Sequence, residues 1–483
     1  MVGGGYVTLH ACIQLRRALR RDIGAGAVEL VVISADDAHN FHGFTGEVLA
    51  GMMPLRRTRT PLERICRPAE VLHGRVTAVD RDNRIVIYLP VGAEEPADLR
   101  YDELIIGTGG REPVEAVPGL AEHGYTLRGP GELGRFVAVV EHLSTADGPG
   151  GRVVVAGGGL AGVELAAAVA DRGRGRIAVD LVHAGEHLLP ALRADQPGLA
   201  RRAECDLIGL GVRVHPVVRL AGVTTNAAVL SDGRVLPADA VLGVIGQRPL
   251  PIAGLDADLR DAGGRLVTRP DLSVADHVWA AGDAARVLHV HTGVPVPANA
   301  LWAIKGGAQV GRNVARVLRG RPARRFGYRG LGQAASFGLG RSIAELYGVP
   351  FTGPLAWVLR LSFFLRFMPS RRTAVSVVGD VAKVLRGKRL CADGGWITSA
   401  DSQSATTNGR GSRRRAAIEA VKSSTQVPSP PRIAAAVGTK SPESTGSRAT
   451  PGTRPFSLVT HTPAAACQAC ASTITAVVEH NAT

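Results

Sequence analysis

The amino-acid sequence predicts an α/β fold in which helices cover parallel sheets, and three observations support this prediction. The chain has 483 residues with 45% apolar content, which suits about two or three domains with sizeable cores. An apolar run at 152–156 is typical of a strand buried on both faces of a parallel sheet. Glycine-rich turns at 3–8 and 157–162 each lead into a helical pattern.

The second of these turns has the full pattern of a phosphate-binding turn. The strand at 152–156 runs into Gly157-x-Gly159-x-x-Gly162, and a helix is predicted over 163–170. Gly157 permits the tight turn, Gly159 lets a pyrophosphate approach the backbone, and Gly162 lets helix and strand pack closely. The helix N-terminus offers unpaired N–H groups to phosphates. We therefore predict a dinucleotide site here, the alternative being a glycine loop without a ligand.

The residue that should contact the ribose of this dinucleotide is unusual. The next strand, 177–182, is followed by His183, where an acidic residue would accept from the 2′-hydroxyl and repel a 2′-phosphate. Arginines just upstream could attract a phosphate, or they could simply be a solvated helix end: Arg172, Arg174 and Arg176. NADH is therefore slightly favoured, and NADPH stays open.

The first turn, Gly3-x-Gly5-x-x-Thr8, departs from the pattern twice. Only Met1 and Val2 precede it, whereas a central strand needs about five residues. Thr8 replaces the third glycine and must fit a crowded crossing of helix and strand. These departures suggest that the natural start of the chain lies upstream, or that the chain is clipped.

The sequence after the first turn supplies the rest of a nucleotide-binding unit. Apolar residues at 9, 12, 13, 15 and 19 form one face of a helix, and a second apolar strand follows at 28–33. Ser34 and Asp36 come directly after this strand, where the ribose of a dinucleotide is usually contacted. The ribose contact is expected from one of them or from the adjacent Asp37, or is absent.

Three further motifs follow in order along the chain. They are a strand that ends in Thr108-Gly109, a turn that begins at Gly246, and a strand at 278–282 that leads into Asp283. Together with the two turns, these motifs resemble the pyridine-nucleotide:flavin oxidoreductases.

The resemblance implies two Rossmann-like dinucleotide-binding domains, one for FAD and one for NAD(P), with the NAD(P) domain inserted in the FAD domain. It implies that Thr108 and Gly109 leave the FAD half, that Gly246 closes the NAD(P) half, and that Asp283 meets the ribityl–pyrophosphate region of FAD. It also places Val76 and Ala303 among the cofactor-binding residues.

The same resemblance gives the expected domain boundaries. They are a first part of the FAD-binding domain at 1–120, the NAD(P)-binding domain at 121–246, the returning part of the FAD domain at 247–320, a C-terminal region with amphipathic helices at 321–390, and a tail at 391–483. The tail is rich in Ser, Thr, Ala, Pro and Gly, which predicts disorder.

Within that family the chain is most similar to type II NADH dehydrogenases, through the segments 326–332, 338–346 and 353–357. This similarity implies hydride transfer from NAD(P)H to flavin N5, followed by electron transfer to a quinone. It also implies that Glu164 lies near the nicotinamide as a catalytic residue, the alternative being an ordinary helix glutamate.

One departure puts the quinone in doubt. The segment that carries two glutamines in type II dehydrogenases has Leu301 and Lys305 in their places. A soluble NAD(P)H:acceptor reductase that serves a small protein carrier is therefore an alternative. A second alternative is a non-catalytic protein that has lost FAD and binds only a nucleotide or a membrane.

Thiol and metal chemistry are not expected. Residues 37–60 contain no cysteine, although disulfide reductases of this architecture carry a redox pair there. Cys12 and Cys66 are separated in sequence and are interpreted as inert apolar residues, and the Cys467-x-x-Cys470 pair lacks a strand–helix context and is given no role. No metal-ligand spacing appears in the matched region, and the histidines at 39 and 42 are interpreted as polar loop residues.

Charge and two amphipathic segments indicate an anionic partner surface. The net charge is +15 and aromatic content is 4%, which argues against base-stacking surfaces for nucleic acid. Helices are predicted over 355–368, interrupted by Arg360 and Arg366, and over 373–385, with basic flanks. With no secretory signal visible, we expect a cytoplasmic protein that lies peripherally on the inner face of the cell membrane. The alternative is a helical pair that covers a homodimer interface or the protein's own core.

Overall fold

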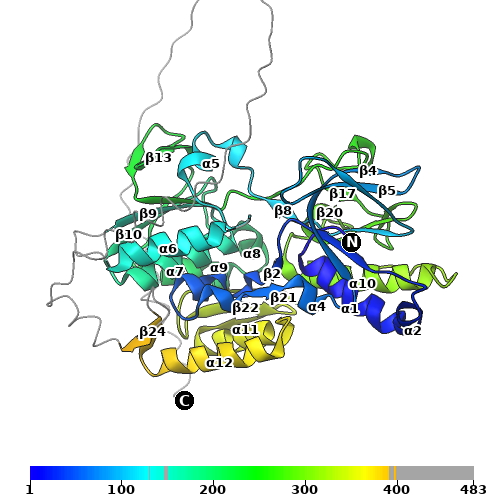
Figure 1. Ribbon diagram of the computed structural model, residues 1–483. Coiled ribbons are helices and arrows are strands. Elements are labelled where there is room, and N and C mark those ends of the chain that lie inside the picture. The colour runs from blue at the N-terminus through cyan, green and yellow to red at the C-terminus, as the bar shows by residue number, and fades with distance from the viewer. Residues whose placement is uncertain (130, 146–150, 391–395, 399–483) are drawn as a thin grey trace, which may run out of the picture. The chain divides into compact units, whose positions relative to one another are not determined.

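The structure is a computed structural model that describes residues 1–129, 131–145, 151–390 and 396–398. The described residues belong to one compact unit, 1–409, and confirm the predicted α/β fold (Figure 1). The tail predicted at 391–483, with Cys467 and Cys470, lies outside the described residues except for a short strand at 396–398.

The first half of the fold gathers strands from segments far apart in the chain. Its sheets have the orders β1-β4-β5-β6 and β18-β19-β7, with β19 parallel to β7. These strands are β1 (Val31–Ser34), β4 (Glu70–Asp80), β5 (Ile85–Pro90), β6 (Ala97–Arg100), β7 (Leu104–Ile106), β18 (Ser273–Ala275) and β19 (Val278–Ala280). The strand predicted at 28–33 thus begins only at Val31.

The position of the central strand in this half is filled by the first two residues. Val2 forms parallel bridges with Ile33 on β1 and with Ile106 on β7. The Met1 amine donates to the Val31 carbonyl at 2.8 Å, and the Val2 amide donates to the Ile105 carbonyl at 2.8 Å. These two residues therefore make the hydrogen bonds of a central strand, although they are too few to form a full strand.

Two helices pack closely over this sheet. They are α1 (Tyr6–Ala18) and α10 (Ala300–Val317), which run side by side in Figure 1. Glycines on α10 permit the contact, because a Cβ on Gly307 would lie 2.4 Å from the Val7 carbonyl oxygen and one on Gly311 would lie 2.6 Å from that of Ala11. Helix α10, which lies far along the chain, thereby packs directly against α1, the helix that follows the first glycine turn.

The second half is a four-stranded parallel sheet in the order β11-β10-β9-β15. Its elements include α6 (Glu132–Thr145), β9 (Gly151–Ala156), α7 (Leu160–Gly173), β10 (Ile177–Val182), α9 (Pro197–Gly209), β11 (Arg213–His215) and β15 (Ala240–Gly243). An antiparallel sheet is formed by β12 (Leu220–Val223), β13 (Ala227–Leu230) and β14 (Val235–Pro237).

The C-terminal region consists of a small antiparallel sheet and a pair of helices. The sheet contains β21 (Gly332–Ser336), β22 (Ser342–Leu346) and β23 (Val349–Thr352). The helices are α11 (Gly353–Phe367) and α12 (Arg371–Leu385), which confirm the two helices predicted here. No helix in the described ranges has the length and apolar character needed to span a membrane.

Shorter elements connect these units. They are α2 (Arg20–Gly24), β2 (Ala38–Asn40), α3 (Thr45–Leu49), η2 (Leu55–Arg57), β3 (Arg59–Pro61), α4 (Leu62–Ile65), β8 (Gly110–Arg111), α5 (Leu120–His123), α8 (Pro190–Asp195), β16 (Arg248–Pro249), β17 (Leu266–Val267), η5 (Gly282–Ala284), β20 (Ala285–Arg286), β24 (Lys388–Leu390) and β25 (Trp396–Thr398).

Candidate functional site

The second glycine turn has the geometry of a phosphate cradle. Gly157 has a φ of +141°, and a Cβ there would lie 2.3 Å from the Val244 carbonyl oxygen. A Cβ on Gly162 would lie 1.9 Å from the Gly157 oxygen, whereas one on Gly159 would meet nothing within 4 Å. Helix α7 begins directly after Gly159, and no side chain caps it. The open space and the uncapped helix N-terminus fit a dinucleotide pyrophosphate.

His183 and Gly246 lie beside this turn. His183 follows β10 and is buried, and a Cβ on Gly158 would lie 2.8 Å from the His183 Cβ. Burial lowers the pKa of His183, which favours the neutral ring. Gly246 has a φ of +103° and comes two residues after Val244, which touches the turn. The structure thus brings together all the residues predicted for the second cradle.

The first glycine turn is built against the end of β7. Gly3 has a φ of +100°, and a Cβ there would lie 2.5 Å from the Gly107 carbonyl oxygen and 3.0 Å from the Cα of Thr108. Gly5 precedes α1, which no side chain caps, and the nearest atom to a Cβ on Gly5 is 3.8 Å away. These residues fit the pyrophosphate of a second dinucleotide.

Thr8 takes the place of the third glycine because another glycine faces it. Thr8 is fully buried, and its Oγ1 has no hydrogen-bond partner. A Cβ on Gly107 would lie 2.9 Å from the Val7 Cβ and 3.2 Å from the Thr8 Oγ1. The close crossing of helix and strand is therefore made by a glycine on the strand side, which the sequence pattern did not reveal.

Two of the candidates for the ribose contact lie together. Ser34 ends β1, and its Oγ accepts a hydrogen bond from the Asp36 amide at 3.2 Å. A Cβ on Gly4 would lie 2.8 Å from the same Oγ, so Ser34 borders the turn. Asp36 is half-buried, and burial raises its pKa. Val76 lies on β4, the strand next to β1, and pairs with Tyr88 on β5.

Asp283 is held by a cation that the sequence did not indicate. It lies in η5 and pairs with Arg128 at 3.1 Å. Gly109, with a φ of +68°, lies 3.9 Å (measured from a Cβ built on it) from the same guanidinium. Ala303 is in the first turn of α10, where its Cβ would lie 3.1 Å from a Cβ on Gly282. Arg128 therefore lies close to both Asp283 and Gly109, and Ala303 lies next to the glycine that precedes Asp283.

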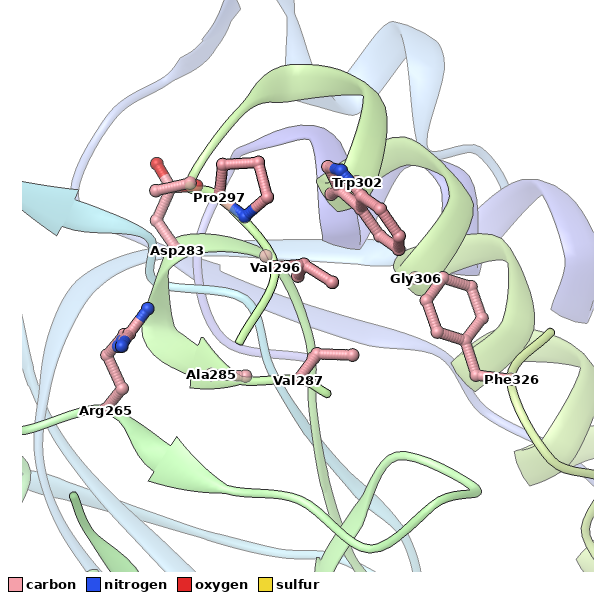
Figure 2. A pocket seen from close by; sticks show the side chains of 11 residues that line it. Arg265, Asp283, Ala285, Val287, Val296, Pro297, Trp302, Gly306 and Phe326 are labelled. Carbon is pink, nitrogen blue, oxygen red and sulfur yellow. The ribbon is translucent and has the colours of Figure 1, made fainter. Parts of the chain in front are cut away.

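A small cavity adjoins Asp283 and the first turn of α10. Figure 2 shows Asp283 and Arg265 on one side of it and Trp302 and Phe326 on the other. The ring of Trp302 packs edge-on against Tyr328, with centroids 4.7 Å apart. The aromatic wall gives this end of the first cradle an apolar lining.

Glu164 is part of a buried ionic cluster. The Arg360 guanidinium donates to Glu47 through Nη1 and to Glu164 Oε1 through Nη2, and also to the Gly43 carbonyl at 3.0 Å. The Ser336 amide donates to Glu164 Oε1 at 3.2 Å. Burial raises the pKa of Glu164 to about 7, Arg360 opposes this and Glu47 adds to it. Such a pKa suits a group that changes protonation near neutral pH.

The placement of Arg360 corrects one sequence-based prediction. This residue was expected to interrupt the apolar face of a helix at a membrane surface, but it is only 4% exposed and points to the two carboxylates. Arg366 on the same helix is exposed. The orientation of Arg360 is set by its ion pair with Glu47, which is 313 residues away along the chain. A local sequence pattern cannot predict so distant a partner.

His39 is also not the polar loop residue that was predicted. It is fully buried on β2, and its Nδ1 donates to the Gly4 carbonyl at 3.0 Å. Burial lowers its pKa to about 4. Next to it, the Tyr6 hydroxyl accepts from the His42 amide at 3.0 Å. Segment 39–47 is thereby attached to the first glycine turn.

Two cysteines that are distant in sequence lie in one cluster. Cys12 on α1 and Cys66 after α4 are both buried and pack with Val32, Leu62 and Ala69. The contact with Cys66 and burial both raise the pKa of Cys12. Both thiols pack as apolar side chains, although they are not isolated from each other.

The residues that replace the two glutamines have different surroundings. Leu301 is 9% exposed, whereas Lys305 is exposed, with its Nζ 5.8 Å from the centroid of the Tyr328 ring. Lys305 places a cation where an amide was expected from the resemblance, one turn along α10 from Leu301.

Comparisons with known proteins agree with this geometry. Residues 1–307 match the family model described as pyridine nucleotide-disulphide oxidoreductase. The chain is 26% identical over 385 residues to a demethylphylloquinone reductase of Synechocystis sp., covering 78% of this chain and 93% of the relative. It is 26% identical over 417 residues to a type II NADH:quinone oxidoreductase of Mycobacterium tuberculosis, covering 78% and 86%.

The fold is similar to solved structures of the same kind. The structure of NDH2 from Plasmodium falciparum in complex with NADH superposes with a TM-score of 0.68 at 13% identity, covering 80% of this chain and 97% of that one. The family match and the relatives confirm the predicted class of enzyme, an oxidoreductase, with FAD and NAD(H) as cofactors.

Proposed function

This chain belongs to the pyridine nucleotide-disulphide oxidoreductase family, and we propose that it is an FAD-dependent NAD(P)H dehydrogenase that reduces a quinone. FAD at the first turn would supply the chemistry, which is acceptance of a hydride from NAD(P)H at flavin N5 and transfer of the electrons to the acceptor. The protein would hold the two nucleotides and exclude water between them.

The observation that carries this proposal is the pair of uncapped, glycine-lined helix starts in one compact unit. Gly5 precedes α1 and Gly159 precedes α7, and open space lies in front of Gly159. Each turn offers N–H groups to one pyrophosphate. Two bound dinucleotides can react only if their far ends meet, and the Glu47–Arg360–Glu164 cluster joins the segments that follow the two turns.

His183 bears on the choice of nucleotide. Its neutral ring lies against Gly158 and carries no negative charge to repel a 2′-phosphate. NADPH therefore stays open as a competing donor beside NADH, which is the donor that we propose.

An anaerobic absorbance spectrum tests the function. The purified chain should carry bound flavin, NADH should bleach it, and a soluble quinone should restore the colour. A matched addition of NADPH compares the two donors. A chain that stays colourless after reconstitution with FAD would contradict the proposal and leave the non-catalytic alternative.

A second candidate function is the reduction of a small protein carrier. Lys305 favours it, because an exposed ammonium near one end of α10 could meet an acidic partner. Comparing turnover with a quinone and with an acidic ferredoxin, at low and high salt, separates the two candidates. Salt-sensitive reduction of the ferredoxin, with none of the quinone, would favour this second function.

We also propose that α11 and α12 rest on the inner face of the cell membrane. Exposed apolar side chains lie along both helices, at Leu355, Val358, Val375, Val378 and Leu385. Exposed cations flank them, at Arg366, Arg371, Arg372, Arg386 and Lys388. Apolar side chains with basic neighbours suit the interface of an anionic bilayer.

Flotation with lipid vesicles tests this placement. The protein should float with vesicles that contain anionic lipid. The double variant with Val375→Asp and Val378→Asp should no longer float with them, although it should keep its bound flavin. Full recovery of the unaltered protein in the protein-only fraction would contradict the membrane proposal. A dimer mass that falls to a monomer in the double variant would instead identify the helical pair as a homodimer interface.

A further inference from the structure

The Glu47–Arg360–Glu164 cluster joins three parts of the chain at one point. Glu47 is on α3, Glu164 is in the second turn of α7, and Arg360 is on α11. The side chains of Arg360 and Glu47 are 3% and 4% exposed, and that of Glu164 is 17% exposed. The charges are therefore largely removed from water, where each strongly affects its neighbours.

This cluster joins two segments that are connected to the two nucleotide turns. Glu164 is two residues beyond Gly162 of the second turn. Glu47 belongs to the segment that is tied to the first turn, since His39 donates to the Gly4 carbonyl and the Tyr6 hydroxyl accepts from the His42 amide. A Cβ on Gly46 would lie 3.2 Å from the Glu164 side chain, so the two segments are in contact.

We propose that Arg360 is a positioning residue, which holds the Glu164 carboxyl group against α3 and favours its ionised form for the hydride transfer. The proposal rests on the proposed function. Bound NAD(P)H would supply a hydride, with both electrons of its C–H bond, and bound FAD would accept it, so that a positive charge would be left on the nicotinamide side. A carboxylate nearby stabilises that charge, and a neutral carboxylic acid does not.

The charge balance of the cluster makes Glu164 dependent on Arg360. Two buried carboxylates close together would share one proton if no cation were present. The guanidinium fork contacts both carboxylates: Nη1 donates to Glu47 Oε1, and Nη2 donates to Glu164, to the Gly43 carbonyl and, at 3.4 Å, to Glu47 Oε2. Among the described residues, Arg360 and Glu47 are the charged groups that act on Glu164, from α11 and α3, and the uncharged Ser336 amide on β21 adds a hydrogen bond.

A second ion pair docks the same helical pair and provides a matched control. Asp380 on α12 is 1% exposed and accepts from Arg57 Nε at 2.8 Å, with Lys383 at 3.3 Å. Arg57 is in η2, in the same part of the chain as Glu47. Substitution of Asp380 therefore removes an ion pair of the same helical pair that does not include Glu164.

Infrared titration of the full chain tests the proposal without turnover. The carboxyl band of Glu164 is assigned by its loss in Glu164→Gln, and its midpoint is compared between the unaltered protein, Arg360→Gln, Glu47→Gln and Asp380→Asn. Arg360→Gln should raise the midpoint by about 1–3 pH units, because an adjacent opposite charge is removed. Glu47→Gln should lower it, and Asp380→Asn should leave it unchanged.

The rate of flavin reduction by NADH, measured against pH, should follow the same midpoints. Arg360→Gln should shift the profile to higher pH, Arg360→Lys should shift it less, and Asp380→Asn should not shift it. An unchanged midpoint in Arg360→Gln, or an equal shift in Asp380→Asn, would overturn the proposal. If Arg360→Gln does not fold, the Glu47→Gln protein replaces it in the test. A Glu164 midpoint in Glu47→Gln that is not lower than in the unaltered protein would then overturn the proposal. A protein that does not react with NADH contradicts the proposed function, while the infrared result still reports on Arg360.

Discussion

At the second glycine turn the close crossing of helix and strand is made by Gly162 on α7, whereas at the first turn it is made by Gly107 at the end of β7. A Cβ on Gly162 would lie 1.9 Å from the Gly157 oxygen, and one on Gly107 would lie 2.9 Å from the Val7 Cβ. Thr8 occupies the helix position that corresponds to Gly162 and is fully buried there. The same packing requirement is met from opposite sides of the contact.

The two turns also differ in how a histidine supports the middle glycine. His39 donates a hydrogen bond to the Gly4 carbonyl, whereas His183 packs its Cβ against the position where Gly158 would carry one. A motif with a missing glycine can therefore keep its backbone geometry when a glycine elsewhere in the chain leaves the space that the helix needs.

The comparison of the two turns leads to four experiments, given from the largest expected effect to the smallest.

Substitution of the crossing glycines should have the largest effect. Gly162→Ala places a methyl group against backbone that cannot move aside, and it should cost more than about 3 kcal/mol of unfolding free energy. Gly107→Ala meets a side chain instead and should cost about 1–3 kcal/mol. Denaturant unfolding measures both. A smaller loss in Gly162→Ala than in Gly107→Ala would reverse this ranking of the turns.

Acid should destabilise the first turn through His39. Its pKa is about 4 in the folded protein and near 6.5 ordinarily, so its stabilising contribution is complete above pH 6.5 and is lost as the pH falls toward 4. The loss from this residue should be about 3 kcal/mol at pH 4. His39→Asn keeps a donor for the Gly4 carbonyl and should flatten the dependence measured by urea unfolding at several pH values. Equal slopes in both proteins would contradict the burial of a neutral His39.

The open glycines should separate ligand binding from stability. A Cβ on Gly159 meets nothing within 4 Å and one on Gly5 has 3.8 Å of room, so both alanine variants should fold with unchanged stability. Crowding of a phosphate should cost about 1–3 kcal/mol of binding free energy, or about 5-fold to 150-fold in affinity. Gly159→Ala should weaken NADH and keep FAD, and Gly5→Ala should lose FAD and keep NADH affinity. Loss of both ligands in either variant would show that the turns are not separate sites.

The smallest effect should come from Thr8. Its buried Oγ1 has no partner, so Thr8→Val should stabilise the protein by about 1 kcal/mol. Thr8→Ser keeps the hydroxyl and removes the methyl group, and should destabilise it. Thermal unfolding compares the two, and a less stable Thr8→Val would mean that the hydroxyl has a partner such as a bound water.

The sequence by itself determined the second cradle and the helical pair at the C-terminal end of the described residues. Strand, glycines and helix follow one another there within 151–173, and the bounds of β10 follow from local pattern, although α7 begins at Leu160 and not at the predicted residue 163. The order of motifs also predicted the class of enzyme and its cofactors. Short-range patterns report such features because backbone conformation and amphipathic faces depend on neighbouring residues.

Only the tertiary structure decided which distant residues meet. It placed Gly107 opposite Thr8, buried His39 under Gly4, and turned Arg360 from an expected surface position into contact with Glu47 and Glu164. It also let Met1 and Val2 act as a central strand by pairing with two others. The physical reason is that burial and charge partners are set by packing between segments, which leaves no periodic signal in either segment alone.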